Sequence, residues 1–183
     1  YDFEGNEDCF RSCDEMYPEG GQRVACYDAC GGGGDNGGDG NNYAGTQFGS
    51  TCFIAGTLIQ IPSGIKFIED IKVGDVVTSF DVGTSSIVNS KVTETFVHSD
   101  RYYMIINGII KTTSAHPFYS DGKWIEAGSL SIGDKILHVD GLEHTIETIE
   151  LSDEAVTVYN FEVDGTHNYF AEGYLVHNKI GGG

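Results

Sequence analysis

The sequence has few basic residues and no long hydrophobic run. Lysine and arginine together number 10, against 28 aspartate and glutamate residues, so the formal net charge is −18. A surface this acidic repels nucleic acids and anionic membranes, and we expect neither as a partner. No apolar segment approaches the roughly 18 residues that a membrane-spanning helix needs. The first residues also lack the basic and apolar pattern of a signal peptide. We expect a monomer whose surface charges repel one another.

Cysteine is sparse and unevenly placed. The five cysteines are Cys9, Cys13, Cys26, Cys30 and Cys52. The first four form two pairs with a spacing of four, which places each pair on one face of a helix. A turn signal at Tyr17–Gly21 separates the pairs, so residues 1–30 are predicted to form a helical hairpin.

Disulfides are the favoured state of these paired cysteines, because so short a segment has little core of its own. Two antiparallel helices would let Cys9 meet Cys30 and Cys13 meet Cys26, although four cysteines allow three pairings. A zinc site with four cysteine ligands is the alternative, although zinc ligand pairs are usually closer together. Disulfides form in oxidising surroundings, so we expect a secreted or cell-surface protein.

Residues 31–51 are rich in glycine, aspartate and asparagine. This composition is typical of a flexible, solvated linker, since it offers almost nothing to bury. A calcium-binding repeat is the alternative for glycine alternating with aspartate, but the segment has neither a repeat nor apolar positions that could stack. A domain boundary is therefore predicted here.

From residue 52 onward the chain consists of short β-rich runs separated by turns, and residues 52–178 are predicted to be all-β. No stretch of helical period and useful length interrupts them, apart from a turn at Glu126–Leu130. The predicted strands are 58–61, 65–68, 76–80, 87–97, 102–106, 109–113, 135–139, 144–151, 155–163, 168–170 and 174–176. Val73-Gly-Asp75 and Ile132-Gly-Asp134 each precede a strand, which indicates an internal duplication of about sixty residues.

Four stretches in this segment carry a family resemblance. They are Cys52-Phe-Ile-Ala-Gly-Thr57, Thr113-Ser-Ala-His-Pro-Phe118, Val158-Tyr-Asn-Phe-Glu-Val163 and His167-Asn-Tyr-Phe-Ala-Glu-Gly-Tyr-Leu-Val-His-Asn178. In this order, they resemble the Hint domain, the module shared by inteins, bacterial intein-like domains and the Hedgehog autoprocessing region. The resemblance covers residues 52–178 and implies a horseshoe-like all-β fold that processes its own chain. This length leaves no room for a homing endonuclease.

The resemblance implies a cysteine nucleophile at the start of the domain. Cys52 is expected to attack the carbonyl of Thr51 and convert that amide to a thioester. His116 is expected to act as general acid for the Cys52 nitrogen, and Thr113 to hydrogen-bond the strained amide or the oxyanion. The alternatives are a buried structural cysteine and an exposed loop histidine.

The same resemblance implies a second cleavage at the end of the domain. The side-chain amide of Asn178 is expected to attack its own carbonyl, close a succinimide and release Lys179 onward. His177 and His167 are expected to polarise that carbonyl and assist proton transfer. Asn160 stands where many inteins carry an aspartate or cysteine that couples the two steps. An ordinary surface asparagine is the alternative for Asn178.

Lys179 departs from the intein pattern, because splicing needs a cysteine, serine or threonine at this position. The sequence therefore predicts single-turnover self-cleavage, with hydrolysis after Thr51 and independent cleavage after Asn178. The partners are then the chain's own flanks, residues 1–51 and 179–183. An external thiol or amine is a further possible acceptor for the thioester.

Two other functions compete with self-cleavage. Hedgehog-like transfer to a lipid is disfavoured by the His-Asn terminus and by the lack of an apolar sterol-binding extension. The second competing function is that of a catalytically silent β module that displays the disulfide hairpin for binding. His98, His138 and His144 match no motif and are interpreted as structural or surface residues, so neither a metal nor a cofactor is predicted. Phe118 and Trp124 are expected in the core.

Overall fold

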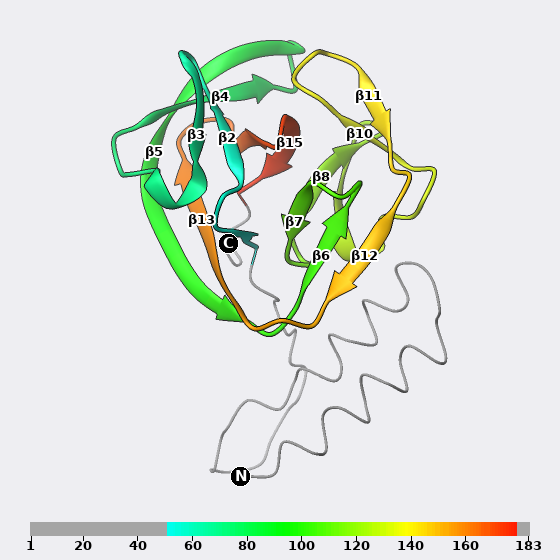
Figure 1. Cartoon of the computed structure of the whole chain (residues 1–183). Coiled ribbons are helices and arrows are strands. Elements are labelled where there is room, and N and C mark those ends of the chain that lie inside the picture. The colour runs from blue at the N-terminus through cyan, green and yellow to red at the C-terminus, as the bar shows by residue number, and fades with distance from the viewer. Residues whose placement is uncertain (1–50, 179–183) are drawn as a thin grey trace, which may run out of the picture.

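The computed structural model describes residues 51–178, which form an all-β fold as predicted (Figure 1). The helical hairpin expected at residues 1–30, most of the linker and the segment 179–183 lie outside the described residues. Within residues 51–178, no helix is long and apolar enough to cross a membrane. The strands are β1 (Phe53–Ile54), β2 (Leu58–Ile61), β3 (Gly64–Phe67), β4 (Val76–Asp81), β5 (Ser86–Asp100), β6 (Tyr103–Ile106), β7 (Ile110–Thr112), β8 (Pro117–Ser120), β9 (Lys123–Glu126), β10 (Lys135–Leu137), β11 (Glu143–Thr145), β12 (Ile149–Ser152), β13 (Val156–Val163), β14 (Asn168–Ala171) and β15 (Tyr174–His177). Two short 3-10 helices, η1 (Ile68–Asp70) and η2 (Ala127–Ser129), complete the described chain.

The strands form two large antiparallel sheets and a small hairpin. The seven-stranded sheet has the order β12-β6-β7-β1-β13-β5-β4, and the six-stranded sheet has the order β3-β2-β14-β15-β8-β9. β10 and β11 pair only with each other in the third sheet. The long strand β5 curves along one side of the molecule, where it pairs first with β4 and then with β13 (Figure 1). The first and last described strands, β1 and β15, therefore lie inside sheets rather than at their edges.

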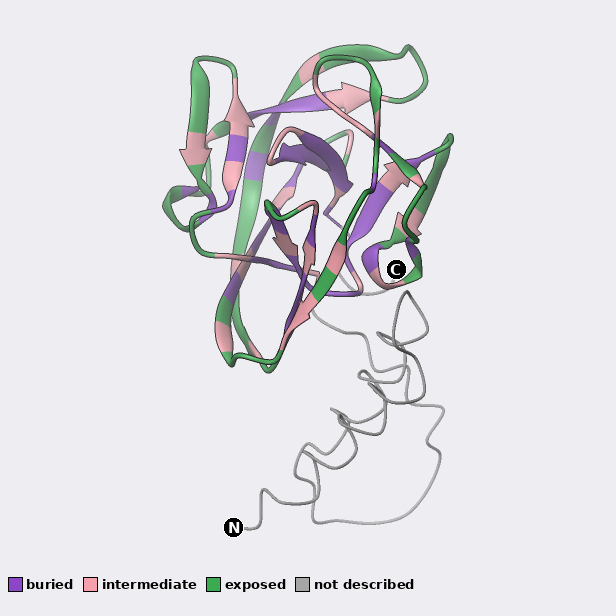
Figure 2. Ribbon diagram, turned by 45° about the vertical axis from the view of Figure 1, so that its right-hand side comes forward, coloured by how far each residue is buried: buried purple, intermediate pink, exposed green. Residues whose placement is uncertain are grey.

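The alternation of apolar and polar residues along the strands builds a shared core. In β13, for example, Val158, Phe161 and Val163 are buried together with Asn160, while Thr157, Tyr159 and Glu162 are more exposed. Large buried side chains from both sheets meet, and each stabilises the fold by roughly 1.5–3 kcal/mol. The largest of them are Phe53, Ile59, Met104, Ile106, Ile110, Phe118, Phe161, Tyr169 and Phe170. Figure 2 shows the buried residues on the inner strands, surrounded by exposed turns.

The internal duplication is visible in the hydrogen bonds of the two Gly-Asp steps. Asp75 accepts a hydrogen bond through its carboxylate from the Lys72 N–H, and Asp134 accepts one from the Ser131 N–H, at 2.9 Å in both cases. Both steps pass through a glycine with positive φ, 93° at Gly74 and 98° at Gly133. Only glycine adopts this conformation without strain. Each step also follows a 3-10 helix and opens a strand, so the same unit occurs twice.

Two predictions about the elements were wrong. The strand expected at residues 144–151 is divided into β11 and β12, because the side-chain oxygen of Asn107 accepts hydrogen bonds from the backbone N–H groups of Glu147 (2.7 Å) and Thr148 (3.2 Å). Trp124, expected in the core, is 36% exposed because β9 is an edge strand. Phe118, which was also expected in the core, is fully buried.

Candidate functional site

The peptide bond between Thr51 and Cys52 lies directly before β1, in the middle of the seven-stranded sheet. Because β1 pairs with β7, the residue that follows β7 reaches this bond. The backbone N–H of Cys52 donates a hydrogen bond to the Thr113 hydroxyl at 2.9 Å, and the same hydroxyl donates to the Cys52 carbonyl at 3.2 Å. The Thr113 N–H (3.0 Å) and the Thr112 hydroxyl (3.3 Å) also donate to that carbonyl. The Cys52 side chain itself is buried.

A chain of hydrogen bonds holds the Thr51 side of the same peptide bond. The side-chain amide of Asn160 donates from Nδ2 to the Thr51 hydroxyl at 3.2 Å. The Asn160 Oδ1 atom accepts from the Tyr169 hydroxyl at 2.7 Å and from the Phe161 N–H at 2.8 Å. Burial, and then the neighbouring Cys52, raise the pKa of Tyr169 well above its usual value. The Tyr169 hydroxyl is therefore a permanent donor, and it fixes the Asn160 amide with its NH₂ group toward Thr51.

His116 is fully buried between the two ends of the described segment. Its ring packs on Phe53, with ring centroids 4.3 Å apart. Burial, and to a smaller extent the nearby His177, lower the pKa of His116 to about 3, although the backbones of His177 and Thr51 favour the protonated form. Neither ring nitrogen meets strict hydrogen-bond geometry with any residue between 51 and 178. The imidazole is therefore neutral at pH 7 and lies close to the backbone of both Thr51 and His177.

The second predicted cleavage position lies at the end of β15. Asn178 is 3% exposed, and its backbone N–H donates to the carbonyl of His167 at 2.9 Å. His167 has a φ of 54°, which is uncommon for a residue other than glycine. Its ring centroid lies 6.4 Å from that of His177, and the His177 ring packs edge-on against Trp124 at 5.0 Å. His167 and His177, the two histidines predicted at this end, are thus neighbours, and His177 also lies close to His116.

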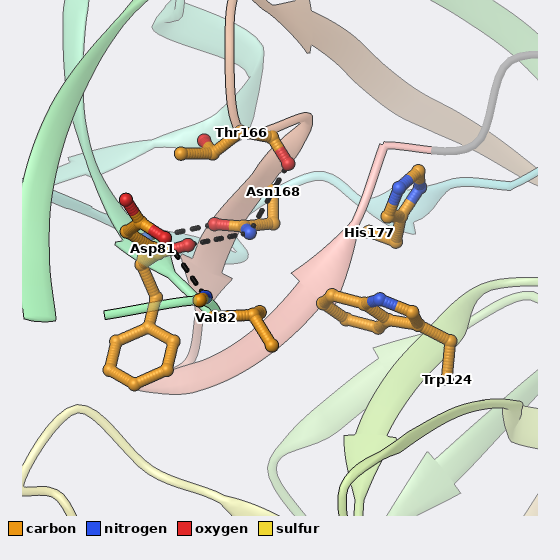
Figure 3. A pocket seen from close by; sticks show the side chains of 8 residues that line it. Asp81, Val82, Trp124, Thr166, Asn168 and His177 are labelled. Atoms are coloured by element: carbon orange, nitrogen blue, oxygen red, sulfur yellow. Dashed lines mark hydrogen bonds between the residues drawn. The ribbon is translucent and has the colours of Figure 1, made fainter. Parts of the chain in front are cut away.

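A pocket of about 280 Å³ opens beside His177 (Figure 3). One wall is held by Asn168, whose side chain accepts from the Phe80 N–H (2.9 Å) and donates to the Phe80 carbonyl (2.8 Å). The pocket has one carboxylate and two aromatic walls in addition to the imidazole. Its lining residues are Phe80, Asp81, Val82, Gly83, Trp124, Thr166, Asn168 and His177.

The structure brings together most of the residues that the sequence singled out. Those around the Thr51–Cys52 bond are Thr113, His116 and Asn160, and those around the far end are His167, His177 and Asn178. Lys179 and the four N-terminal cysteines lie outside the described residues. Sequence reasoning missed Tyr169 and Thr112. The signal for Tyr169 was a hydroxyl-bearing residue inside the motif 167–178, and the signal for Thr112 was its position next to Thr113.

This arrangement suits acyl transfer within the chain. A thiol lies one residue from a carbonyl, and the nitrogen that would leave is held by a hydroxyl. A neutral imidazole close by can both take and return a proton. The described residues therefore bring together a buried thiol, an amide nitrogen held by a hydroxyl and a buried neutral imidazole.

Comparison with known proteins gives a consistent picture. The model of the pretoxin HINT domain family matches residues 58–179. The solution structure of a bacterial intein-like domain from Clostridium thermocellum is 39% identical, with a TM-score of 0.66, and the match covers 70% of this chain and 99% of that one. The gp41-1 intein is 25% identical, with a TM-score of 0.60 and coverage of 70% and 99%. A DnaB intein from Synechocystis sp. PCC 6803, at 22% identity, TM-score 0.64 and coverage of 72% and 100%, shows the shared fold. No curated protein matches the chain.

Proposed function

The chain belongs to the pretoxin HINT domain family, and from that membership we propose that it is a single-turnover self-cleaving domain that cuts the polypeptide on both sides of itself. Self-processing is the general capacity of the Hint and intein fold. The two proposed cleavage positions are the Thr51–Cys52 bond and the bond after Asn178. The site geometry supports a separate mechanism for each.

The first step is an acyl shift from nitrogen to sulfur. The Cys52 sulfur forms a bond to the Thr51 carbonyl carbon, the bond from that carbon to the Cys52 nitrogen breaks, and the thiol proton ends on the new amine. The observation that carries this proposal is the 2.9 Å hydrogen bond from the Cys52 N–H to Thr113, because it holds the leaving nitrogen in one orientation. Water then hydrolyses the thioester and releases the segment that ends at Thr51.

His116 is proposed to carry the proton between sulfur and nitrogen. Its pKa of about 3 leaves the ring neutral at pH 7, so His116 begins the reaction as a general base rather than as a general acid. It takes the thiol proton, is briefly protonated, and gives the proton to the departing Cys52 nitrogen. The backbones of Thr51 and His177 favour the protonated ring, so they stabilise this intermediate. This refines the role of general acid that the sequence predicts.

The second step is proposed to be a cyclisation of Asn178. Its side-chain nitrogen attacks its own backbone carbonyl carbon, a succinimide forms, and the bond to Lys179 breaks with a proton passing to the new amine. The bond from the Asn178 N–H to the His167 carbonyl, together with the burial of Asn178, fixes the attacking residue at the end of β15. His177, which adjoins it, is the group placed to polarise the carbonyl.

Cleavage rather than splicing follows from Lys179, which offers no thiol or hydroxyl to receive the acyl group. The pocket beside His177 supports release of the downstream segment, because it provides an open space next to the residue that precedes Asn178. Asp81 and Trp124 in its walls suit a cationic group such as a protonated amine, and an external amine is one proposed acceptor for the thioester. A small thiol is the other acceptor.

Burial of Cys52 is equally compatible with the alternative of a silent β module. It does not favour that alternative, however, because an attack on the preceding carbonyl needs no access for an outside substrate. A structural cysteine also gives no reason for the clamped Thr51–Cys52 bond, which is held by Thr113 on one side and by Asn160 on the other.

The proposal is tested by following the intact mass of the freshly made full chain over time, beside Cys52→Ala and Asn178→Ala. We expect one fragment ending at Thr51, lost only in Cys52→Ala, and one beginning at Lys179, lost only in Asn178→Ala. Hydroxylamine is expected to trap the thioester and to speed the first cleavage. A folded wild-type chain whose mass never changes, with or without hydroxylamine, would overturn the proposal in favour of the silent module.

A further inference from the structure

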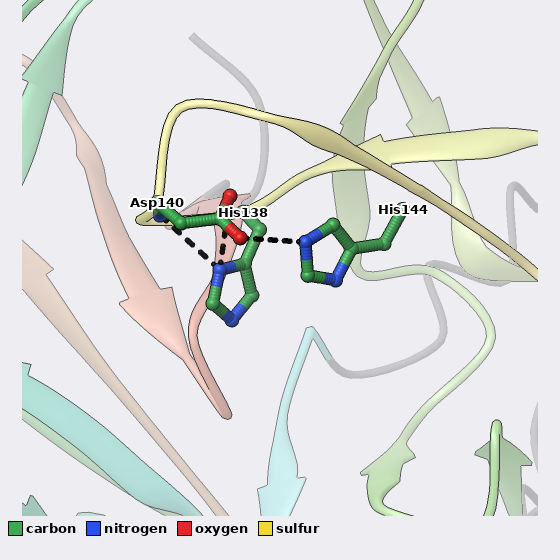
Figure 4. Close-up of side chains that lie close together, drawn as sticks. All are labelled: His138, Asp140 and His144. Carbon is green, nitrogen blue, oxygen red and sulfur yellow. Dashed lines mark hydrogen bonds and ion pairs between the residues drawn. The ribbon is translucent and has the colours of Figure 1, made fainter.

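Two of the histidines that match no Hint motif lie together in the β10–β11 hairpin with an aspartate between them (Figure 4). The Asp140 carboxylate contacts both, with one oxygen 3.3 Å from His138 Nδ1 and the other 2.8 Å from His144 Nε2. One nitrogen from each histidine and one carboxylate oxygen all lie within 4.8 Å of one another. From the sequence alone both histidines are interpreted as structural or surface residues, because neither matches a motif.

We propose that His138, Asp140 and His144 bind a divalent transition-metal ion of the zinc class. Two imidazole nitrogens and one carboxylate oxygen form a ligand set that zinc commonly takes, whereas calcium and magnesium prefer oxygen ligands alone. Bonds of about 2.0–2.2 Å to a tetrahedral ion place the ligand atoms roughly 3.4 Å apart. The contact between Asp140 and His138, at 3.3 Å, is close to that spacing, whereas the contact between Asp140 and His144, at 2.8 Å, has to lengthen. The fourth position is left to water, since all three side chains are partly exposed, at 24–41%.

Metal binding requires two local changes. The Asp140 N–H donates a hydrogen bond to His138 Nδ1 at 3.1 Å, and this bond has to break if Nδ1 binds the ion. The two imidazole rings are stacked, with centroids 4.3 Å apart and planes 12° from parallel. A nitrogen binds metal in the plane of its ring, so at least one ring must turn for both to meet a single ion. Residues 138–144 lie at the surface, but both rings pack edge-on against Tyr174, which is buried, so the rotation has to proceed against that contact.

The surroundings of the cluster resemble the outer shell of a metal site. His144 faces the Tyr174 hydroxyl through Nδ1, at 3.0 Å, and this contact directs Nε2 toward Asp140. Histidine ligands in metal sites are generally oriented by such a partner on the second nitrogen. The Leu142 N–H donates to Asp140 Oδ1 at 2.8 Å and holds the carboxylate in place. The net charge of −18 adds a general attraction for cations.

The site adjoins the strand that ends at the second cleavage position. His138 forms a bridge with Tyr174, the first residue of β15, and the Val139 N–H donates to the Gly173 carbonyl at 2.8 Å. A Cβ atom at Gly173 would collide with the His138 ring, so glycine is required for this approach. A bound ion would therefore lie beside β15, which His144 already contacts through the Tyr174 hydroxyl. The inference concerns binding and does not depend on whether the chain cleaves itself.

The test is a zinc titration of the full chain in a Cys52→Ala, Asn178→Ala background, followed through the imidazole NMR signals of individual histidines. We expect the signals of His138 and His144 to shift together and to saturate in one step. The readout is resolved by residue, so zinc held by the N-terminal cysteines leaves both signals unmoved. Signals that stay unchanged at excess zinc would overturn the proposal.

Three variants sharpen the test. Asp140→Asn is expected to abolish the zinc-dependent shifts while the amide spectrum remains that of a folded chain. Tyr174→Phe, which keeps the ring but removes the hydroxyl, is expected to weaken zinc binding about 10–100-fold. His98→Gln is the control, since His98 lies on β5 outside the cluster. Equal zinc affinity in Asp140→Asn and in the control would also overturn the proposal.

Discussion

The hydroxyl of Thr113 lies 2.9 Å from the amide nitrogen of Cys52 and 3.2 Å from the carbonyl oxygen of the same residue. One side chain thus holds both polar groups of the residue whose peptide bond is proposed to break. It does so because β1 pairs with β7, which brings together positions 61 residues apart. The contact involves the leaving nitrogen, so its loss should affect the first cleavage more than the second.

We expect Thr113→Val to slow cleavage after Thr51 by about 10²–10³-fold, the usual effect of removing one positioned hydrogen-bonding group from a reacting site. Valine keeps the shape of threonine but cannot bond the Cys52 nitrogen. Thr113→Ser keeps the hydroxyl and should retain most of the rate. The measurement is the rate at which the fragment ending at Thr51 appears in mass spectra. Equal slowing after Asn178 would instead indicate a general disturbance of the fold.

Tyr169→Phe tests the hydrogen-bond chain that orients Asn160. The variant leaves Asn160 Oδ1 with only the Phe161 N–H, which should cost about 1 kcal/mol of unfolding free energy. The freed amide can then turn away from Thr51, so cleavage after Thr51 should slow more than cleavage after Asn178. Denaturant unfolding gives the stability change, and the two fragment rates give the effect on the site. Tyr119→Phe, on β8 in the same sheet, is the matched control.

Local patterns in the sequence were sufficient to predict the all-β fold. The apolar alternation of β13 and the two Gly-Asp steps at Gly74 and Gly133 are visible without any tertiary contact. The division of residues 144–151 into two strands was not predictable in this way, because it depends on Asn107, some forty residues earlier.

The same distinction holds for the site. The positions of Cys52, Thr113 and His116 follow from motifs, since each is marked by its immediate neighbours. The low pKa of His116 requires knowing that the ring is fully buried, and the role of Tyr169 requires the contact between β14 and Asn160. Likewise, the approach of His138 to His144 depends on how the β10–β11 hairpin closes.

Burial of a neutral His116 should make the fold sensitive to acid. Its pKa is about 3 in the folded chain and about 6.5 when unfolded, so below pH 6.5 the unfolded chain binds the extra proton. The contribution to stability is therefore lost as pH falls from 6.5 toward 3. At pH 5 the lost contribution amounts to about 2 kcal/mol. The free energy of unfolding of His116→Gln should therefore fall by about 2 kcal/mol less than that of the parent between pH 7 and pH 5.

The measurement is urea unfolding at both pH values in the Cys52→Ala, Asn178→Ala background, so that the chain stays intact. His98→Gln is the control, because His98 is exposed and its replacement should leave the pH dependence unchanged. An identical loss of stability in His116→Gln and its parent would contradict a buried neutral imidazole at this position.

Lys179→Cys tests whether the two proposed cleavage positions are close enough for acyl transfer. The new thiol at position 179 can attack the Thr51 thioester, after which cyclisation of Asn178 releases the transferred segment, and a shift from sulfur to nitrogen restores a peptide bond. Because the His116 ring lies near the backbones of both Thr51 and His177, we expect a joined product of residues 1–51 with 179–183. Lys179→Ala should give separate fragments only. If Lys179→Cys also gave separate fragments at the wild-type rates, the two positions would be too far apart for transfer, and the position of His116 close to the backbones of both Thr51 and His177 would be contradicted.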